Sequence, residues 1–143
     1  MLPTILILNG PNLNLIGRRE PAVYGTESLD QYLQSLSAQL AGQARLICLQ
    51  SNHEGQLLDW LHEHGFSVQG IVLNAGAFSH TSIALHDAIK AITAPVVEVH
   101  ISNTAARESF RHHSYLSAAA RAVIMGAGLK GYALAVDLLL ENQ

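Results

Sequence analysis

The segment EVHIS places Glu98 and His100 two residues apart within an apolar run. Side chains alternate between the two faces of a β-strand, so this pair would share a face if the run is a strand. A carboxylate beside an imidazole can fix which ring nitrogen carries the proton. The pair therefore predicts proton transfer by His100, with Glu98 as its orienting partner. The alternative is a pair at a strand end that simply faces solvent.

A second candidate group lies in NGPNLNLIGRREPAVYG, residues 9–25, which follows the apolar run TILIL. Most strand-to-helix connections have only ~2–6 residues, and longer ones are often lids or binding loops. A phenol such as Tyr24 is a poor base at neutral pH unless a nearby cation favours the phenolate, and Arg19 could supply that cation. The alternative is a packed tyrosine with the arginine in solvent. The charged stretch between two glycines predicts a mobile lid over residues of about 17–25.

Other site chemistries do not fit the spacing of residues. His62 and His64 would face different ways on a helix, adjacent His112 and His113 also diverge, and there is no HExxH or paired-cysteine motif. GAGLKG matches the dinucleotide pattern G-x-G-x-x-G, but only twelve residues follow Gly131, too few for the acidic residue expected ~20 positions later. We interpret its glycines as close packing of a strand and a helix. We expect neither metal nor cofactor, and a site suited to a small, oxygen-rich anion.

The elements that must position these residues alternate along the chain. Short apolar runs recur at residues 4–8, 45–49, 70–73, 95–101 and 121–125, and unbroken apolarity is typical of strands covered on both faces. Helical patterns lie between them: leucines over 29–40 behind the N-cap Ser28, leucines over 57–61 ending at Gly65, and segments of about 81–91 and 131–140. The alternation predicts one α/β domain over residues 1–143, flavodoxin-like, with a five-stranded parallel sheet in the order 2-1-3-4-5 and helices on both faces.

In such open sheets, ligands bind outside the carboxyl ends of the strands. The segments that follow the predicted strands are NGPNLN, QSNHEG, NAGAFSHTS, HISNTAARESFRHHS and GAGLKG. Asparagine, histidine, serine and arginine therefore collect at one edge of the sheet. This edge is the predicted active site.

Bulk composition limits the possible partners. Only 13% of residues are charged, against roughly 25% in ordinary soluble domains, which predicts that some surface is buried against copies of the same chain. The net charge of −3 and the lack of a basic run argue against nucleic acid, and no apolar run is long enough to span a membrane. Cys48, within RLICLQ, is predicted to be a small core residue rather than a nucleophile, and a lone cysteine without a signal peptide fits the cytoplasm.

The accumulated motifs resemble one family. LNGPNLNLIGRREPAVYG, QSNHEGQLLDWLH, LNAGAFSHTSIALHDA, VVEVHISNTAARESFRHHSYLS and GAGLKGYALA are similar to segments of type II 3-dehydroquinate dehydratases, in order along the chain. The resemblance implies a flavodoxin-like lyase without a cofactor, and trimers assembled into a dodecamer. It implies reversible dehydration of 3-dehydroquinate to 3-dehydroshikimate, in the shikimate pathway to aromatic amino acids or in quinate catabolism.

The resemblance also implies roles for individual residues. Tyr24 matches the base that removes a proton alpha to the C3 carbonyl, and Arg19 the lid residue that favours its phenolate. Asn12 matches the residue that stabilises the enolate. His100 matches the acid that protonates the departing C1 hydroxyl, with Glu98 as its orienting partner. A cofactor-free elimination of this kind depends on donors aimed at the enolate oxygen.

Six further residues match substrate-binding positions of the family. The substrate carboxylate would be bound by Asn74, Ile101 and Ser102, and the ring hydroxyls by His80, Arg111 and Asp87, the last from a neighbouring subunit. Two positions depart from the common pattern: His86 stands where arginine is usual and Ala75 where proline is frequent. His86 puts in doubt the strength of the charge network between subunits around Asp87. The alternative is that His86 is a plain exposed helix residue.

Two other functions stay open on the sequence. A flavodoxin-like module could bind a nucleotide or flavin, which would predict a coloured protein or stabilisation by nucleotide. A catalytically inactive scaffold would keep the oligomer and lack turnover, although the complete set of Arg19, Tyr24, Asn12 and His100 argues against it.

Overall fold

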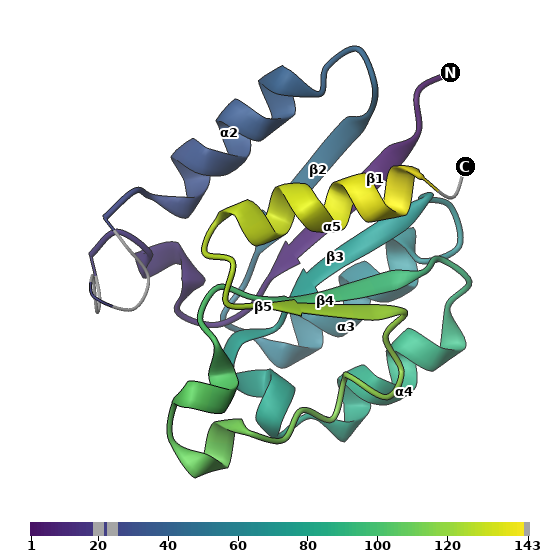
Figure 1. The fold of residues 1–143 in the computed structure, drawn as a ribbon. Helices are drawn as coiled ribbons and strands as arrows, with labels where there is room; N and C mark the ends of the chain where they lie inside the picture. Colours follow the sequence, from purple (N-terminus) through teal and green to yellow (C-terminus); the bar gives the residue numbers. More distant parts are fainter. Residues whose placement is uncertain (19–21, 23–25, 142–143) are drawn as a thin grey trace.

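A computed structural model describes residues 1–18, 22 and 26–141 of the chain. Its centre is a parallel sheet whose five strands follow the order β2-β1-β3-β4-β5 (Figure 1). The strands are β1 (Thr4–Asn9), β2 (Arg45–Gln50), β3 (Gly70–Asn74), β4 (Val96–His100) and β5 (Ala122–Met125). The predicted fold class and strand order are confirmed.

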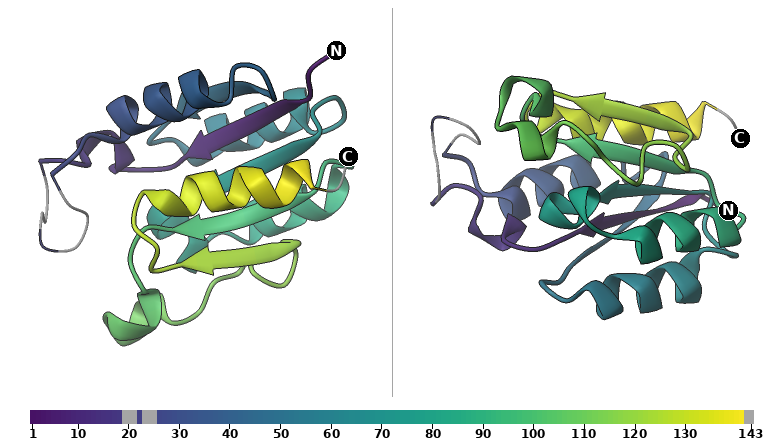
Figure 2. Two further views of the ribbon diagram at one scale, coloured as in Figure 1. Left: turned by 45° about the horizontal axis from the view of Figure 1, so that its top comes forward. Right: turned by 90° about the horizontal axis from the view of Figure 1, so that it is seen from below.

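Helices cover both faces of this sheet. They are α2 (Leu29–Gln39), α3 (Glu54–His64), α4 (Ile83–Ala91) and α5 (Lys130–Leu140). Helices α2 and α5 lie on one face, and α3 and α4 on the other, so that the molecule has three layers (Figure 2). Each face has its own apolar core, one containing Ile5, Ile7, Leu33 and Val136, the other Leu6, Leu8, Leu61 and Leu85. None of the helices in the described part is long and apolar enough to cross a membrane.

The ends of the helices follow from local chemistry. Helix α2 begins after Ser28, whose Oγ accepts a hydrogen bond from the backbone N–H of Gln31 at 3.0 Å. Ser82 caps α4 in the same way, with the N–H of Leu85 at 2.9 Å. Helix α3 ends at Gly65, where a Cβ would lie 2.4 Å from a carbonyl oxygen of the preceding turn. Such caps satisfy backbone groups that have no partner inside the helix.

The two edge strands differ from the prediction that every strand is covered on both faces. β1, β3 and β4 are buried along almost their whole length, whereas β2 and β5 contain exposed residues. The prediction of Cys48 as a core residue is wrong, because it is exposed on β2. Its thiol borders the gap between β2 and α2, where partial desolvation, followed by the negative charge of Asp30, raises its pKa to about 11. Apolar composition alone does not distinguish an edge strand from a central one.

The glycines of GAGLKG serve two purposes. Gly131 lies in the contact between α5 and the sheet, as predicted, although a Cβ there would lie 3.4 Å from the side chain of Val99 on β4, which is close to ordinary van der Waals contact. Gly126 and Gly128 instead have φ values of +85° and +64°, in the left-handed region that favours glycine. They form the turn from β5 into α5.

The loops at the carboxyl ends of the strands contain short 3₁₀ segments, which are η1 (Leu13–Leu15), η2 (Gly76–His80), η3 (Thr104–Ala106) and η4 (Ser109–Arg111). The loops after β1 and β3 are in close contact. The N–H of Gly10 donates to the carbonyl of Asn74 at 2.8 Å, and a Cβ on Gly10 would lie 2.4 Å from the oxygen of Ala75. This contact fixes the positions of the two loops relative to each other, and both loops carry polar residues at this edge of the sheet.

Candidate active site

A cleft lies beyond the carboxyl ends of β1, β3 and β4, at the edge that the sequence predicted for the site. It is bordered by the loops that follow these three strands. Its lining residues are Pro11, Asn12, Leu13, Asn74, Gly76, Ala77, His80, His100, Ile101, Ser102, Thr104, Arg107 and Arg111.

The structure brings together most of the candidate site residues. Those that line the cleft are Asn12, Asn74, His80, His100, Ile101, Ser102 and Arg111. Glu98 lies directly behind His100 and does not border the cleft. Asp87 is exposed on α4 and is not among the lining residues of its own chain. Arg19 and Tyr24 lie outside the described residues, as does most of the predicted lid.

His100 and Glu98 form a buried pair at the end of β4. The imidazole Nε2 donates to Glu98 Oε2 at 2.5 Å, and the two residues are only 6% and 0% exposed. The alternative of a solvent-facing pair is therefore wrong. Because Nε2 is bound to the carboxylate, Nδ1 is the ring nitrogen left for other partners.

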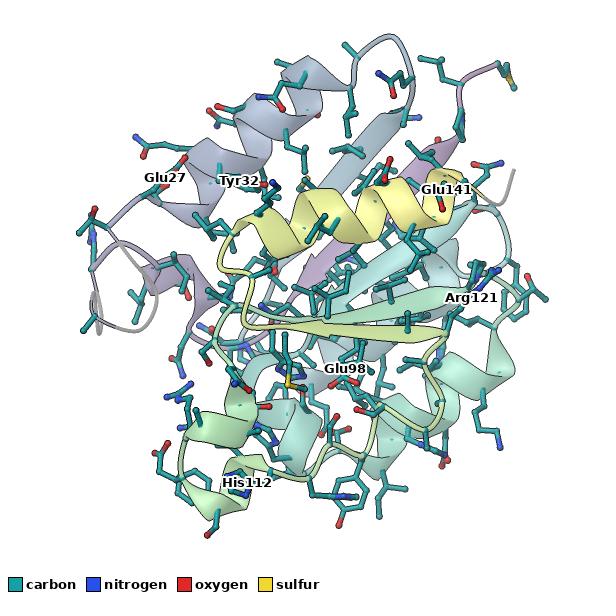
Figure 3. All side chains as sticks on the ribbon, viewed as in Figure 1. Glu27, Tyr32, Glu98, His112, Arg121 and Glu141 are labelled. Atoms are coloured by element: carbon teal, nitrogen blue, oxygen red, sulfur yellow. The ribbon has the colours of Figure 1, made fainter. Side chains whose placement is uncertain are left out.

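Two serine hydroxyls complete the surroundings of Glu98. Ser114 Oγ donates to Oε2 and Ser117 Oγ to Oε1, each at 2.7 Å. Both come from the segment between η4 and β5, which passes beside Glu98 (Figure 3). Burial raises the pKa of Glu98, but the hydrogen bonds from His100 and the two serines outweigh it and hold the pKa below the ordinary value of 4.5. Glu98 is therefore a carboxylate at neutral pH. Sequence reasoning missed both serines, because nothing in their local pattern shows which strand residue they meet.

His80 lies beside the ring of His100. Its Nδ1 donates to the carbonyl oxygen of His113 at 2.8 Å, which leaves Nε2 as the free acceptor or donor of this ring. The His80 and His100 rings are stacked, with centroids 6.2 Å apart and planes inclined by 20°. One imidazole from the end of β4 and one from η2 thus lie side by side at the cleft.

A buried polar chain fixes the amide of Asn74. Asn74 Nδ2 donates to the phenol oxygen of Tyr132 at 2.8 Å, and the Tyr132 hydroxyl donates to Asn9 Oδ1 at 2.6 Å. Asn74 Oδ1 accepts from the N–H of Gly76 at 3.2 Å. Tyr132 is fully buried, and desolvation raises the pKa of its phenol, so it remains neutral as both donor and acceptor. Sequence reasoning missed Tyr132 and Asn9, since their contact joins residues 123 positions apart.

The cleft also has a cationic wall. Arg107 Nη1 donates to Ser102 Oγ at 3.3 Å, and Arg111 Nε donates to Glu108 at 3.1 Å. Two guanidinium groups on one side of a small cleft favour an anionic ligand. Arg107 was not among the predicted site residues, although its place after β4, four residues before Arg111, was a usable signal.

Asn12 lines the cleft and has an unusual backbone conformation. Its φ is +69°, a region that asparagine tolerates better than most residues, and its N–H donates to Asn52 Oδ1 at 3.0 Å. The contact ties the loop after β1 to the loop after β2.

The two departures from the family pattern have defined surroundings. His86 is half-buried and its Nδ1 donates to the carbonyl oxygen of Tyr115 at 2.7 Å, so its interpretation as a plain exposed helix residue is wrong. Ala75 is fully buried beneath Gly10. In the described part of the chain, no three or more His, Cys, Asp or Glu residues are grouped to hold a metal ion.

Comparison with known proteins gives the family. The family model described as dehydroquinase class II matches residues 3–140. The chain belongs to this family. The resemblance seen in the sequence is thus confirmed, and with it the enzyme class, a hydro-lyase.

Individual relatives agree with this result. A 3-dehydroquinate dehydratase of Acidovorax sp. (strain JS42) is 55% identical, with 99% of each chain covered. A protein of Aspergillus flavus named catabolic 3-dehydroquinase 2 is 54% identical over 99% of this chain and 95% of its own. The crystal structure of a type II dehydroquinase from Propionibacterium acnes has a TM-score of 0.93 at 43% identity, covering 99% of this chain and 98% of that one.

Proposed function

We propose that this dehydroquinase catalyses the reversible dehydration of 3-dehydroquinate to 3-dehydroshikimate. The observation that carries the proposal is the buried His100–Glu98 pair, which meets the cleft beside amide, hydroxyl and guanidinium groups. This arrangement supplies a proton donor next to donors for a carboxylate and ring hydroxyls. Relatives covered over 95% or more of their length bear the same activity in their names.

In the proposed mechanism, Tyr24 removes the proton alpha to the C3 carbonyl and Arg19 favours its phenolate. Asn12 stabilises the enolate, and His100 then protonates the departing C1 hydroxyl while Glu98 orients it. A base and an acid in separate surroundings can each hold the ionisation state that its step needs. The roles of Arg19 and Tyr24, and of residues of about 17–25 as a lid within one catalytic domain, are supported by the sequence motifs.

Substrate binding is assigned to the remaining cleft residues. Asn74, Ile101 and Ser102 would hold the carboxylate, and His80 and Arg111 the ring hydroxyls. The stacked rings of His80 and His100 support this arrangement, because they bring a hydroxyl-binding group and the proposed acid to adjacent positions.

Asp87 would reach the site of a neighbouring subunit, within trimers that assemble into a dodecamer. Its exposure on α4, outside the cleft of its own chain, supports such a contribution. Exposed apolar side chains, including Ile83 on α4 at 59% and Phe110 in η4 at 65%, are suited to burial against another copy.

The direct test is the growth of ultraviolet absorbance from the conjugated enone when purified protein meets 3-dehydroquinate. His100→Ala should lower kcat by about 100-fold or more, with a smaller change in KM, and Glu98→Gln should lower it less. His62→Ala, an exposed histidine on α3, is the matched control and should behave as wild type. Equal losses in His100→Ala and Glu98→Gln would instead assign the proton transfer to the carboxylate.

We also propose that the reaction needs no metal or cofactor. Activity should survive dialysis against a chelator, and restoration of lost activity by Zn²⁺ or Mg²⁺ would contradict the mechanism.

The shikimate pathway and quinate catabolism both use this reaction, and the cytoplasm is its proposed location. The catabolic name of the Aspergillus relative makes quinate use a specific second possibility.

A further inference from the structure

The carboxylate of Glu98 accepts hydrogen bonds on both oxygens. Oε2 accepts from His100 Nε2 at 2.5 Å and from Ser114 at 2.7 Å, while Oε1 accepts from Ser117 at 2.7 Å. Glu98 is fully buried, so water does not compete for these positions. The carboxylate therefore cannot rotate without breaking a hydrogen bond to at least one serine.

We propose that Ser114 and Ser117 are positioning residues for His100. Their hydroxyl groups hold the Glu98 carboxylate so that it receives the imidazole Nε2–H, and Nδ1 remains the nitrogen that transfers the proton. The proposal rests on the proposed function, in which His100 is the acid. Neither serine lines the cleft, so both act through Glu98.

The direction of the serine hydroxyls supports this role. Ser114 Oγ accepts a hydrogen bond from the backbone N–H of Leu116 at 3.1 Å, so its own hydrogen is available for Glu98. Leu116 is fully buried in the core shared with α3 and α4. The serine segment is thereby anchored to the core between the sheet and helices α3 and α4.

The charge of Glu98 decides which tautomer His100 adopts. An ionised carboxylate can only accept, so Nε2 must carry a hydrogen. A protonated Glu98 could donate to Nε2, and the ring hydrogen would then move to Nδ1. Burial favours the protonated form, and the hydrogen bonds from His100 and the two serines oppose it.

Three other ionisable groups, His80, Arg107 and Arg111, border the cleft beside His100. His80 lies against the His100 ring rather than against Glu98, and Arg107 and Arg111 line the cleft. Among the described residues, His100 is the one ionisable partner that lowers the pKa of Glu98. The remaining stabilisation of the charge therefore comes from the two neutral hydroxyls.

The test compares Ser117→Ala and Ser114→Ala with wild type in full pH profiles of kcat and KM. Each should lower kcat by about 3- to 10-fold, the equivalent of one hydrogen bond, with little change in KM. Loss of activity in acid should begin at higher pH, because the ionised form of Glu98 has lost a donor. Ser117→Thr keeps a hydroxyl and should restore the wild-type profile.

Ser79→Ala is the matched control. Ser79 is fully buried near the site, and its Oγ has no hydrogen-bond partner among the described residues. This variant should keep the wild-type profile. An equal shift in Ser79→Ala would show that the effect is general to buried serines and would overturn the proposal.

A double substitution separates charge from packing. In a Glu98→Gln background there is no carboxylate to protonate, so Ser117→Ala should no longer move the pH profile. A shift of the same size in this background would overturn the proposal. Unchanged kcat and pH profile in both single serine variants would overturn it as well.

Nitrogen NMR of the histidine ring distinguishes failure of this inference from failure of the proposed function. Neutral His100 should carry its hydrogen on Nε2 in wild type, and Ser117→Ala should increase the share of the Nδ1–H form. This readout does not depend on turnover. An unchanged tautomer ratio would contradict the positioning role even if the enzyme is active, and a changed one would support it even without activity on 3-dehydroquinate.

Discussion

Substitution of Tyr132 by phenylalanine tests the buried polar chain beneath the cleft. The hydroxyl of Tyr132 donates to Asn9 at 2.6 Å and accepts from Asn74 at 2.8 Å. All three residues are buried, with exposures of 0%, 1% and 3%. The aromatic ring packs in the core beneath the sheet and is retained in the variant. The substitution therefore removes two hydrogen bonds and almost no apolar contact.

The magnitude follows from these contacts. A buried polar group without a partner costs ~1–3 kcal/mol, and the substitution leaves one acceptor on Asn9 and one donor on Asn74. The phenylalanine variant has no hydroxyl to remove from water on folding, and this offsets part of the lost stability. We expect destabilisation by about 2–4 kcal/mol, or a fall in Tm of about 6–12 °C for a chain of this size.

The assay is urea unfolding of wild type and Tyr132→Phe at one fixed protein concentration, because oligomerisation makes apparent stability concentration-dependent. Tyr115→Phe is the control. Tyr115 is 38% exposed, so loss of its hydroxyl leaves no buried polar group without a partner. Because Asn74 lines the cleft, KM of the folded variant should rise more than kcat falls. Destabilisation below about 0.5 kcal/mol with an unchanged m-value would refute the reasoning.

The same variant has a predicted pH signature. Burial raises the pKa of Tyr132 above the ordinary 10.0, so the unfolded chain releases this proton before the folded one. The contribution of the neutral phenol to stability is thus complete below pH 10 and is lost as the pH rises above it. The stability difference between wild type and Tyr132→Phe should shrink above pH 10. A difference that stays constant through that range would contradict the buried neutral phenol.

Three further predictions concern other parts of the chain. Tyr24→Phe should reduce kcat by about 100-fold or more while circular dichroism stays unchanged, and near-normal kcat would remove Tyr24 from the role of base. Cys48, whose pKa is raised to about 11, should react slowly with a disulfide reagent at pH 7 and faster as the pH rises from 9 to 11; fast reaction at pH 7 would contradict the raised pKa. Light scattering should give a mass well above the 15.4 kDa of one chain, and a fully active monomer would contradict the role of Asp87 in a neighbouring site.

The amino-acid sequence by itself determined the order of elements and the edge that carries the site. Apolar runs and leucine spacing are local patterns, and the caps at Ser28 and Gly65 depend on residues within one helical turn. The pairing of Glu98 with His100 was also predictable, because it depends only on the two-residue period of one strand. Motifs along the whole chain identified the family for the same reason, since each is a contiguous segment.

Other features were decided only by the tertiary structure. Cys48 lies in an apolar run like those of the central strands, and its exposure results from the place of β2 at the edge of the sheet. Ser114 and Ser117 reach Glu98 across 16 and 19 positions, and Tyr132 reaches Asn9 across 123. Serine and tyrosine occur in many surroundings, and a single sequence does not show which distant atom their hydroxyl groups will meet. These partners are fixed by how the strands stack in the sheet and where the loops return, because a hydrogen bond needs its two atoms within about 3 Å of each other.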